Sequence, residues 1–145
     1  MFLTHKGCDW ILRDKVLQMI LGVGMDIVEV QRIETLLRRF GSRFVTRIFN
    51  DYEIAYCEKQ SRPARHYAVR FAAKEAFVKA VGERRAAYPG MRWSDIGVQR
   101  TPKGQPVLTF KGTIKEVVGQ IGMRQAHLSL THSTEYAAAV VILET

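Results

Sequence analysis

The chain is organised around one stretch, Arg70-Phe71-Ala72-Ala73-Lys74-Glu75-Ala76-Phe77-Val78-Lys79-Ala80-Val81-Gly82. Apolar residues recur here at the i, i+3 and i+4 spacing of one helical face, formed by Val69, Ala72, Ala73, Ala76, Phe77 and Ala80. Glu75 and Lys79 fall along one edge of this face, and Arg70 and Lys74 fall along the other. The spacing therefore predicts a long helix, from about Ala64 to Val81, whose charges border a packed surface and which Gly82 ends.

A second stretch, residues 20–29, reads ILGVGMDIVE and predicts a strand. Because side chains alternate along a strand, Gly22, Gly24 and Asp26 share one side, and Leu21, Val23, Met25 and Ile27 share the other. Two glycines beside a carboxylate leave space that another backbone or a ligand can approach, so Asp26 is expected to face a clearing. Taken alone, Asp26 could equally cap the following helix, and Glu75 and Lys79 could be an ordinary surface ion pair worth about 0.2–0.5 kcal/mol.

Together the two stretches resemble the holo-acyl carrier protein synthases, the small bacterial type of phosphopantetheinyl transferase. The signatures are Gly22-Val23-Gly24-Met25-Asp26-Ile27-Val28-Glu29 and the stretch from Arg70 to Gly82 quoted above, in the order and at the separation of that family. The resemblance runs from about Met19 to the C-terminus, so residues 19–145 are interpreted as the transferase domain and residues 1–18 as an N-terminal extension. It implies that 4′-phosphopantetheine is transferred from coenzyme A to a serine of apo-acyl carrier protein.

Length and composition set the outer bounds. A chain of 145 residues with 47% hydrophobic content provides the material of one domain, and no apolar run approaches the roughly 20 residues of a membrane span. Two cysteines are too few for a disulfide framework, which fits a reducing cytoplasm, so we expect a cytoplasmic protein without a membrane partner. A net charge of +8 indicates an acidic partner without identifying it.

A basic helix surface follows the glycine-containing strand. Val30, Ile33, Leu36, Leu37 and Phe40 repeat at helical spacing before Gly41, and basic residues occupy the other side and the residues that follow, with Arg32, Arg38, Arg39 and Arg43 among them. An ordinary solvated helix surface would show the same pattern. The resemblance implies that these four arginines dock an acidic acyl carrier protein, which explains the charge without nucleic acid.

The remaining sequence completes an α+β fold in which antiparallel strands pack beneath the long helix. A capped short helix is predicted from Asn50 to Lys59, strands at 96–100, 107–110, 126–131 and 136–143, and a further helix at 113–121. Residues 101–106 read as the turn of a hairpin. In the resembling family a Gly-x-Pro at this point, here Gly104 and Pro106, borders coenzyme A.

Ser129-Leu130-Thr131-His132 ends a predicted strand. A nearby serine and histidine invite a hydrolase interpretation, but the Gly-x-Ser-x-Gly elbow is missing and adjacent positions do not give the geometry of a catalytic triad. The segment resembles the Ser-x-Ser-His of the family, with Thr131 in place of the second serine. By that resemblance Thr131 and His132 contact the 3′-phosphate of coenzyme A.

The implied reaction places negative charge on a pyrophosphate while a serine hydroxyl is oriented. Mg²⁺ suits this chemistry because it takes one or two carboxylates and completes its octahedron with waters and phosphate oxygens. Asp26 and Glu75 are the predicted metal ligands, and Lys79, one helical turn after Glu75, is predicted to reach the same pyrophosphate. Glu75 and Lys79 are thus the candidate catalytic residues, although Glu75 and a metal-bound water both remain candidates for the base.

Some relatives carry an additional acid where this chain has Val28. Glu29 would point away from Asp26 in a continuing strand, so we do not count it as a ligand.

Assembly and two rival functions complete the expectations. The nearly unbroken apolar run from Ala137 to Leu143 would suit pairing of sheets between chains, although the long helix could also cover it. The resemblance implies a homotrimer with the metal carboxylates on one chain and His132 on the next. An RNA-binding module would share the basic charge but lacks aromatic-rich stacking strands, and a Mg²⁺-dependent nucleotide hydrolase would share the carboxylates and Lys79.

Overall fold

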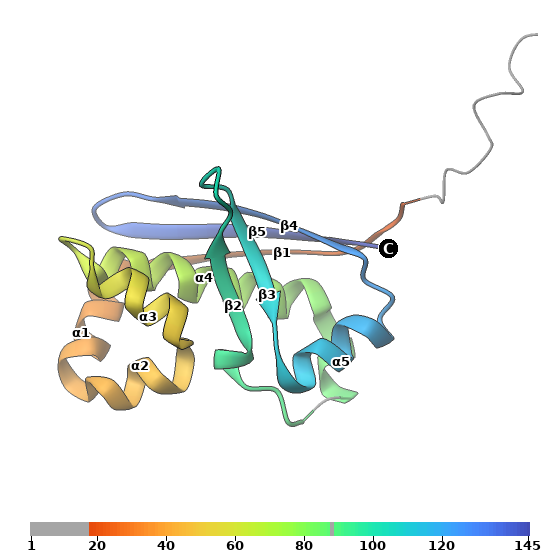
Figure 1. Cartoon of the computed structure of the whole chain (residues 1–145), viewed down its shortest axis with the longest axis horizontal. Coiled ribbons are helices and arrows are strands. Elements are labelled where there is room, and N and C mark those ends of the chain that lie inside the picture. Colours follow the sequence, from red (N-terminus) through yellow and green to blue (C-terminus); the bar gives the residue numbers. More distant parts are fainter. Residues whose placement is uncertain (1–17, 88) are drawn as a thin grey trace, which may run out of the picture.

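The computed structural model describes residues 18–87 and 89–145 (Figure 1). The elements are β1 (Ile20–Glu29), α1 (Val30–Phe40), α2 (Ser42–Ile48), α3 (Asp51–Glu58), α4 (Pro63–Val81), the 3₁₀ segments η1 (Gly82–Ala87) and η2 (Trp93–Asp95), β2 (Ile96–Arg100), β3 (Pro106–Phe110), α5 (Gly112–Gln120), β4 (Gln125–His132) and β5 (Tyr136–Glu144). The N-terminal extension suggested by the sequence, residues 1–18, lies outside the described residues except for Gln18.

The strands form two antiparallel sheets, which confirms the predicted α+β class with antiparallel pairing. One sheet has the order β1-β5-β4, and the other is the β2-β3 hairpin. In the first sheet Asp26 of β1 lies opposite Ala139 of β5, which lies opposite Leu130 of β4. Figure 1 shows the three strands running side by side, with α4 along one face of the sheet and α1, α2 and α3 gathered at one end.

The two glycines of β1 let helix α4 approach the strand closely. A Cβ atom added at Gly22 would overlap the backbone carbonyl of Ala80, and one added at Gly24 would overlap that of Ala76. The predicted clearing is therefore filled by a second backbone, and a side chain at either glycine would force the helix away from the sheet. This contact brings residues 75–79 beside Asp26.

Helix α4 is buried on most sides, which corrects for Arg70 and Lys74 the expectation that its charges border the packed face, whereas Glu75 and Lys79 do lie at its border. Arg70 and Lys74 are both fully enclosed. The sheet covers one side of the helix, while α1, α3 and β2 contact others, so residues off the apolar stripe are buried as well. The periodicity located the helix but did not reveal how much of its surface is covered.

Local signals set the helix ends. Asn50 and Glu53 form a capping box at the start of α3, Pro63 begins α4, and Gly41 and Gly82 end α1 and α4 with φ angles of +51° and +64°. These boundaries confirm the predicted helices within one or two residues. Helix α2, which follows Gly41 directly, was not predicted, because the glycine that ends α1 also separates it from α2.

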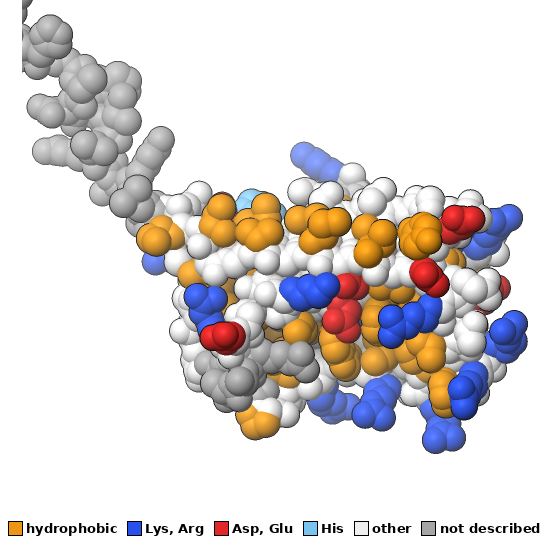
Figure 2. Space-filling view, turned by 180° about the vertical axis from the view of Figure 1, so that it is seen from behind, with side chains coloured by type: hydrophobic (Ala, Val, Ile, Leu, Met, Phe, Trp, Pro, Cys, Tyr) orange, Lys and Arg blue, Asp and Glu red, His pale blue; other side chains and the backbone are white. Residues whose placement is uncertain are grey.

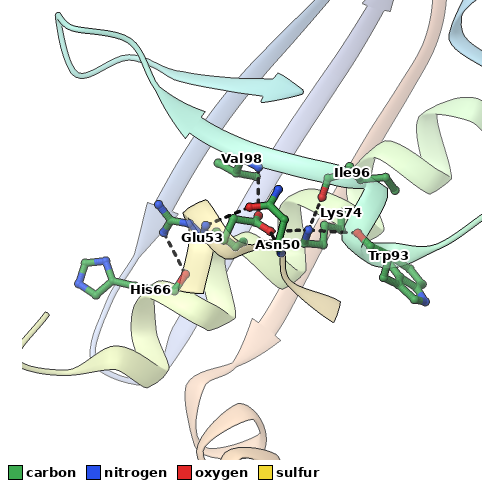
Figure 3. Close-up of polar contacts among 8 residues, drawn as sticks. Asn50, Glu53, His66, Lys74, Trp93, Ile96 and Val98 are labelled. Atoms are coloured by element: carbon green, nitrogen blue, oxygen red, sulfur yellow. Dashed lines mark hydrogen bonds and ion pairs between the residues drawn. The ribbon is translucent and has the colours of Figure 1, made fainter. Parts of the chain in front are cut away.

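A buried ion pair joins α3, α4 and β2. The Lys74 Nζ atom donates to Glu53 Oε2 at 2.8 Å and to the carbonyl oxygens of Trp93 and Ile96, as Figure 3 shows. The Glu53 carboxylate also accepts from the backbone N–H groups of Asn50 and Val98, each at 3.0 Å. Burial lowers the pKa of Lys74, and the charge of Glu53 acts against this effect. The partners of the pair come from the start of α3, from η2 and from β2, so the pair fixes how these segments meet.

The outer face of the β1-β5-β4 sheet, opposite α4, remains exposed. Val23, Met25 and Ile27 are 58%, 59% and 61% exposed, and Tyr136 on β5 is 46% exposed. Seen from behind, hydrophobic side chains form a row along one side of the molecule (Figure 2). Exposed apolar rows of this length are uncommon on monomers and are typical of contact surfaces.

None of the described helices combines the length and the apolar character that crossing a bilayer requires.

Candidate functional site

The structure brings Asp26 of β1 and Lys79 of α4 into direct contact. The Lys79 Nζ atom lies 2.7 Å from Asp26 Oδ1 and donates a second hydrogen bond of 3.0 Å to the carbonyl oxygen of Met25. The side chain of Asp26 is 15% exposed and that of Lys79 is 53% exposed. The pair therefore lies at the surface end of the tight contact between β1 and α4.

Glu75 acts electrostatically on the same lysine, and we call Asp26, Glu75 and Lys79 together the carboxylate group. The hydrogen bond to Asp26 raises the pKa of Lys79, and the negative charges of Asp26 and Glu75 raise it further. Lys79 therefore stays an ammonium at neutral pH, between two carboxylates that are far apart in the sequence. Glu75 is partly buried.

The two carboxylates, Asp26 and Glu75, suit Mg²⁺ better than they suit a metal ion whose ligands all come from the protein. Among residues 18–87 and 89–145, no three His, Cys, Asp or Glu side chains gather closely enough to form a metal cage. Two carboxylates match the need of Mg²⁺, which usually keeps waters and phosphate oxygens as its other ligands. Val28 is buried and Glu29 is exposed on alternate sides of β1, so neither adds a ligand beside Asp26.

A second group of polar side chains surrounds the first turns of α4. The His66 ring lies 5.5 Å from the His132 ring of β4 and 5.8 Å from the Tyr56 ring of α3, in both cases edge to face. The guanidinium of Arg70 stacks over the Tyr56 ring at 4.1 Å, and that of Arg100 lies 5.7 Å from the same ring. We call His66, Arg70, Arg100 and His132 the cationic cluster.

Arg70 carries a buried charge that forms no ion pair with an acidic side chain in the described part of the chain. It donates to the carbonyl oxygen of His66 at 3.2 Å, but its Nε atom has no hydrogen-bond partner among the described residues. The ion pairs of the described residues do not include Arg70. Buried charges are normally paired, so a guanidinium next to two imidazoles and a second arginine favours an anionic ligand.

The predicted coenzyme A residues fall at two edges of this cluster. His132 faces the α4 side of the sheet, whereas Thr131, one residue earlier, faces the outer side. The carbonyl oxygen of Gly104 accepts a 3.1 Å hydrogen bond from Arg100, and Pro106 is the residue opposite Arg100 in the β2-β3 hairpin. The hairpin turn is thereby tied to the cluster through Arg100. Within one chain, the side chains of Thr131 and His132 lie on opposite faces of the sheet, so both cannot contact the same phosphate.

The serine next to His132 has a structural role. The Ser133 hydroxyl accepts hydrogen bonds from the backbone N–H groups of Glu135 at 3.2 Å and Tyr136 at 3.1 Å. It therefore holds the β4-β5 turn and is not paired with His132, whose ring packs against His66.

The buried cysteine is not a candidate nucleophile either. Burial raises the pKa of the Cys57 thiol to about 12, so the thiol stays protonated near neutral pH.

The four predicted docking arginines, Arg32, Arg38, Arg39 and Arg43, are all exposed on α1 and α2. Beside them lies a cavity of about 310 Å³ that is lined by Leu36, Phe40, Arg43, Phe44 and Arg47. Helix α2, missed by the sequence, places Phe44 and Arg47 on this surface. The result is an apolar groove edged by arginines.

A larger cavity, of about 780 Å³, opens where β1 ends and α4 begins. Arg62 and Arg65 line it together with the β4-β5 turn, and Arg65 donates a 3.0 Å hydrogen bond to Thr134 of that turn. Its volume lies within the usual range for small-molecule sites. Sequence reasoning did not identify this cavity, because its walls come from three distant segments.

The carboxylate group and the cationic cluster lie apart within one chain. Glu75 follows His66 by nine residues in α4, which corresponds to about 14 Å along the helix axis at a rise of about 1.5 Å per residue. In the sheet, Asp26 lies on β1 and His132 on β4, with β5 between them. Sequence reasoning missed His66 and Arg100, since no motif links an α4 residue or a β2 residue to the end of β4.

Comparisons with known proteins show what the chain is similar to. The family model described as the 4′-phosphopantetheinyl transferase superfamily matches residues 22–141. The holo-acyl carrier protein synthase of Koribacter versatilis is 47% identical over 126 residues, which cover 87% of this chain and 99% of the relative. The crystal structure of the Neisseria meningitidis holo-acyl carrier protein synthase aligns with a TM-score of 0.77 and 32% identity over 88% of this chain and 100% of that chain.

The Bacillus anthracis holo-acyl carrier protein synthase, solved in complex with coenzyme A (3′,5′-ADP), aligns with a TM-score of 0.67 and 36% identity, over 88% of this chain and 98% of that chain.

Proposed function

The chain belongs to the 4′-phosphopantetheinyl transferase superfamily, among the holo-acyl carrier protein synthases, and from this premise we propose how its own residues carry out the transfer. The reaction moves 4′-phosphopantetheine from coenzyme A to a serine of apo-acyl carrier protein and leaves adenosine 3′,5′-bisphosphate. The observation that carries the proposal is the group of Asp26, Glu75 and Lys79 at the contact between β1 and α4.

We propose that Asp26 and Glu75 hold Mg²⁺, which when bound neutralises the pyrophosphate and polarises the phosphorus that is attacked. Lys79 already donates to Asp26 and remains charged, so it is positioned to contact the same pyrophosphate as a point charge. Both effects stabilise the negative charge that develops on the departing 3′,5′-bisphosphate. Cytoplasmic location follows from the need for coenzyme A and acyl carrier protein.

We propose that the cationic cluster binds the 3′-phosphate of coenzyme A. A phosphate would pair with the buried Arg70 and lie beside His132, which satisfies charges that have no acidic partner in the described chain. Gly104 and Pro106 border the adenosine from the hairpin that carries Arg100. Thr131, on the outer side of β4, faces the region where a neighbouring chain would pack.

Two observations support a homotrimer with sites between neighbours. The exposed outer face of the sheet offers an apolar contact surface, and trimerisation would bury it. The 3′- and 5′-phosphates are carried by one ribose, yet Glu75 and the His66 ring, which contacts His132, are separated by about 14 Å along the α4 axis of one chain. A single coenzyme A would therefore use the carboxylates of one chain and the cluster of the next.

Mixed trimers test this arrangement. Chains carrying Glu75→Ala and chains carrying His132→Ala, each poorly active alone, are expected to regain activity when unfolded together and refolded as a mixture. In a ring with one site per interface, each mixed trimer contains one intact site, so an equal mixture should reach about one quarter of wild-type activity. Verified mixed trimers that are no more active than either parent would show that Glu75 and His132 do not meet across an interface.

We propose that the carrier protein docks on Arg32, Arg38, Arg39 and Arg43. Acyl carrier proteins are acidic, and Arg43, with Arg47, lines an apolar groove that suits a helix with one apolar and one acidic face, while the other three arginines are exposed on one helix, α1. The docking surface is separate from the carboxylate group, so its charge should affect the protein substrate rather than coenzyme A.

Arg32→Glu combined with Arg39→Glu is expected to raise the KM for the carrier protein roughly tenfold or more at low salt, with the KM for coenzyme A nearly unchanged. Surface charges steer an acidic partner, and salt screens them, so the difference should shrink as ionic strength rises. Lys115→Glu combined with Arg124→Glu gives the same change in net charge on other elements and serves as the control. Equal changes in both KM values would mean that this surface does not dock the carrier.

The function itself is tested by incubation with Mg²⁺, coenzyme A and an apo-acyl carrier protein, followed by intact mass measurement. A gain of one phosphopantetheine on the carrier, lost in the presence of a chelator, is the expected result. Cleavage of coenzyme A without modification of the carrier would identify a nucleotide hydrolase instead.

A further inference from the structure

His66 occupies a position that neither motif includes. It lies in the first turns of α4, partly buried, with its ring edge-on to Tyr56 of α3 on one side and to His132 of β4 on the other. Its own backbone carbonyl accepts the hydrogen bond from the buried Arg70. His66 is therefore packed within the cationic cluster, in ring contact with the histidine that the family resemblance assigns to the 3′-phosphate.

The charges that act on His66 are all positive. They come from Arg65 and Arg70 on α4, from Arg100 on β2 and from His132 on β4, and Tyr56 on α3 is the titratable group in contact from the remaining side. Within residues 18–87 and 89–145, the groups that perturb the ring include no carboxylate. Burial, and after it these neighbouring charges, lower the pKa of His66 below its ordinary value. The ring is thus neutral at pH 7 in the chain alone.

A bound phosphate would reverse this electrostatic balance. A 3′-phosphate brings nearly two negative charges into a cluster that contains four basic side chains, and a nearby negative charge favours the protonated form of an imidazole. His66 sits against His132, so a phosphate that contacts His132 lies near both rings. A protonated His66 ring adds charge where the ligand needs it, without requiring a further partly buried cation in the unliganded protein.

We propose that His66 is a second imidazole of the 3′-phosphate site, and that it takes up a proton from solvent when coenzyme A binds. The step is a proton transfer alone: an N–H bond forms at the ring nitrogen as the bond to that proton breaks in hydronium or a buffer acid, and no other bond changes. The complex then holds more protons than its separated components, so affinity for coenzyme A strengthens as pH falls from 8 to 6. The inference rests on the proposed function, because it requires that the 3′-phosphate binds at His132.

The experiment measures binding of coenzyme A to the full-length protein by titration calorimetry between pH 6 and 8, in two buffers of different ionisation enthalpy. The buffer dependence of the heat gives the number of protons taken up. His66→Phe preserves an aromatic ring against Tyr56 and His132 but cannot titrate, and His66→Gln is a second variant of smaller volume. His127→Gln replaces a histidine that pairs with Glu144 at 2.8 Å elsewhere in the sheet and is the matched control. 3′-Dephospho-coenzyme A is the matched ligand.

The wild type and His127→Gln should take up more protons with coenzyme A than either His66 variant does. The ratio of Kd values between variant and wild type should grow roughly three- to tenfold from pH 8 to pH 6, because one coupled proton changes affinity by up to tenfold per pH unit. The titration of the phosphate itself cancels in this comparison, and the difference should vanish with 3′-dephospho-coenzyme A.

Equal proton uptake by the wild type and by folded His66 variants that still bind coenzyme A would overturn the role of His66 and leave the proposed function intact. Failure of the wild type to bind coenzyme A, or equal affinity for coenzyme A and its 3′-dephospho form, would instead overturn the proposed 3′-phosphate site.

Discussion

Asp26→Ala and Glu75→Ala are each expected to lower the rate of phosphopantetheine transfer by about 10²-fold or more, because each removes one of two carboxylates proposed to hold Mg²⁺. Neither change should unfold the protein. Asp26 pairs with an exposed lysine, and exposed ion pairs contribute only about 0–1 kcal/mol. Transfer is measured by the mass of the carrier protein, and folding by circular dichroism and thermal denaturation.

The matched control is Glu116→Ala, which removes an exposed carboxylate from α5, away from the contact between β1 and α4. It should retain wild-type transfer. Raising Mg²⁺ should partly restore activity in the two site variants, since each retains one carboxylate. Near-normal turnover of Asp26→Ala or Glu75→Ala at ordinary Mg²⁺ would show that the metal lies elsewhere.

Lys74→Met is expected to lower the free energy of unfolding by about 3–5 kcal/mol, because it leaves the Glu53 carboxylate buried without its cationic partner. Both side chains of this pair are 0% exposed, so solvent does not replace the lost interaction. Lys79→Met is the matched control for stability: it breaks an ion pair of almost the same length, 2.7 Å against 2.8 Å, whose lysine is exposed. Its loss should stay below about 1 kcal/mol.

Chemical denaturation of the two variants gives the comparison directly. The double variant Glu53→Gln with Lys74→Met removes both buried charges and should recover a substantial part of the stability lost by Lys74→Met alone. Similar losses for Lys74→Met and Lys79→Met would show that burial of the Glu53-Lys74 pair does not govern its contribution.

Much of the fold was predictable because its signals are local. Pro63 and Gly82 define the ends of α4, the Asn50-Glu53 capping box defines the start of α3, and alternation along residues 20–29 defines β1. Each signal depends on backbone geometry or hydrogen bonding within a few residues, which the sequence states directly. Helix α2 was missed because the glycine that ends α1 leaves only a short segment before Asn50.

The sequence also paired the two carboxylates of the candidate site, but only through family resemblance. Nothing in residues 20–29 alone states that Asp26 approaches Lys79, since the two are 53 residues apart in the sequence. The physical reason for their contact is the pair of glycines, which lets the backbone of α4 reach β1 and sets Lys79 within 2.7 Å of Asp26.

By itself the sequence determined most of the elements, with α2 as an exception, their boundaries, and the chemical types of the residues in the carboxylate group. Only the tertiary structure decided that Arg70 and Lys74 are buried, that the apolar side of β1 is exposed, and that His66 meets His132. Helical periodicity records which residues are apolar, but burial depends on how many neighbours surround the helix, and α4 is covered on several sides. The cationic cluster arises from segments joined only by packing, so no local pattern could predict it.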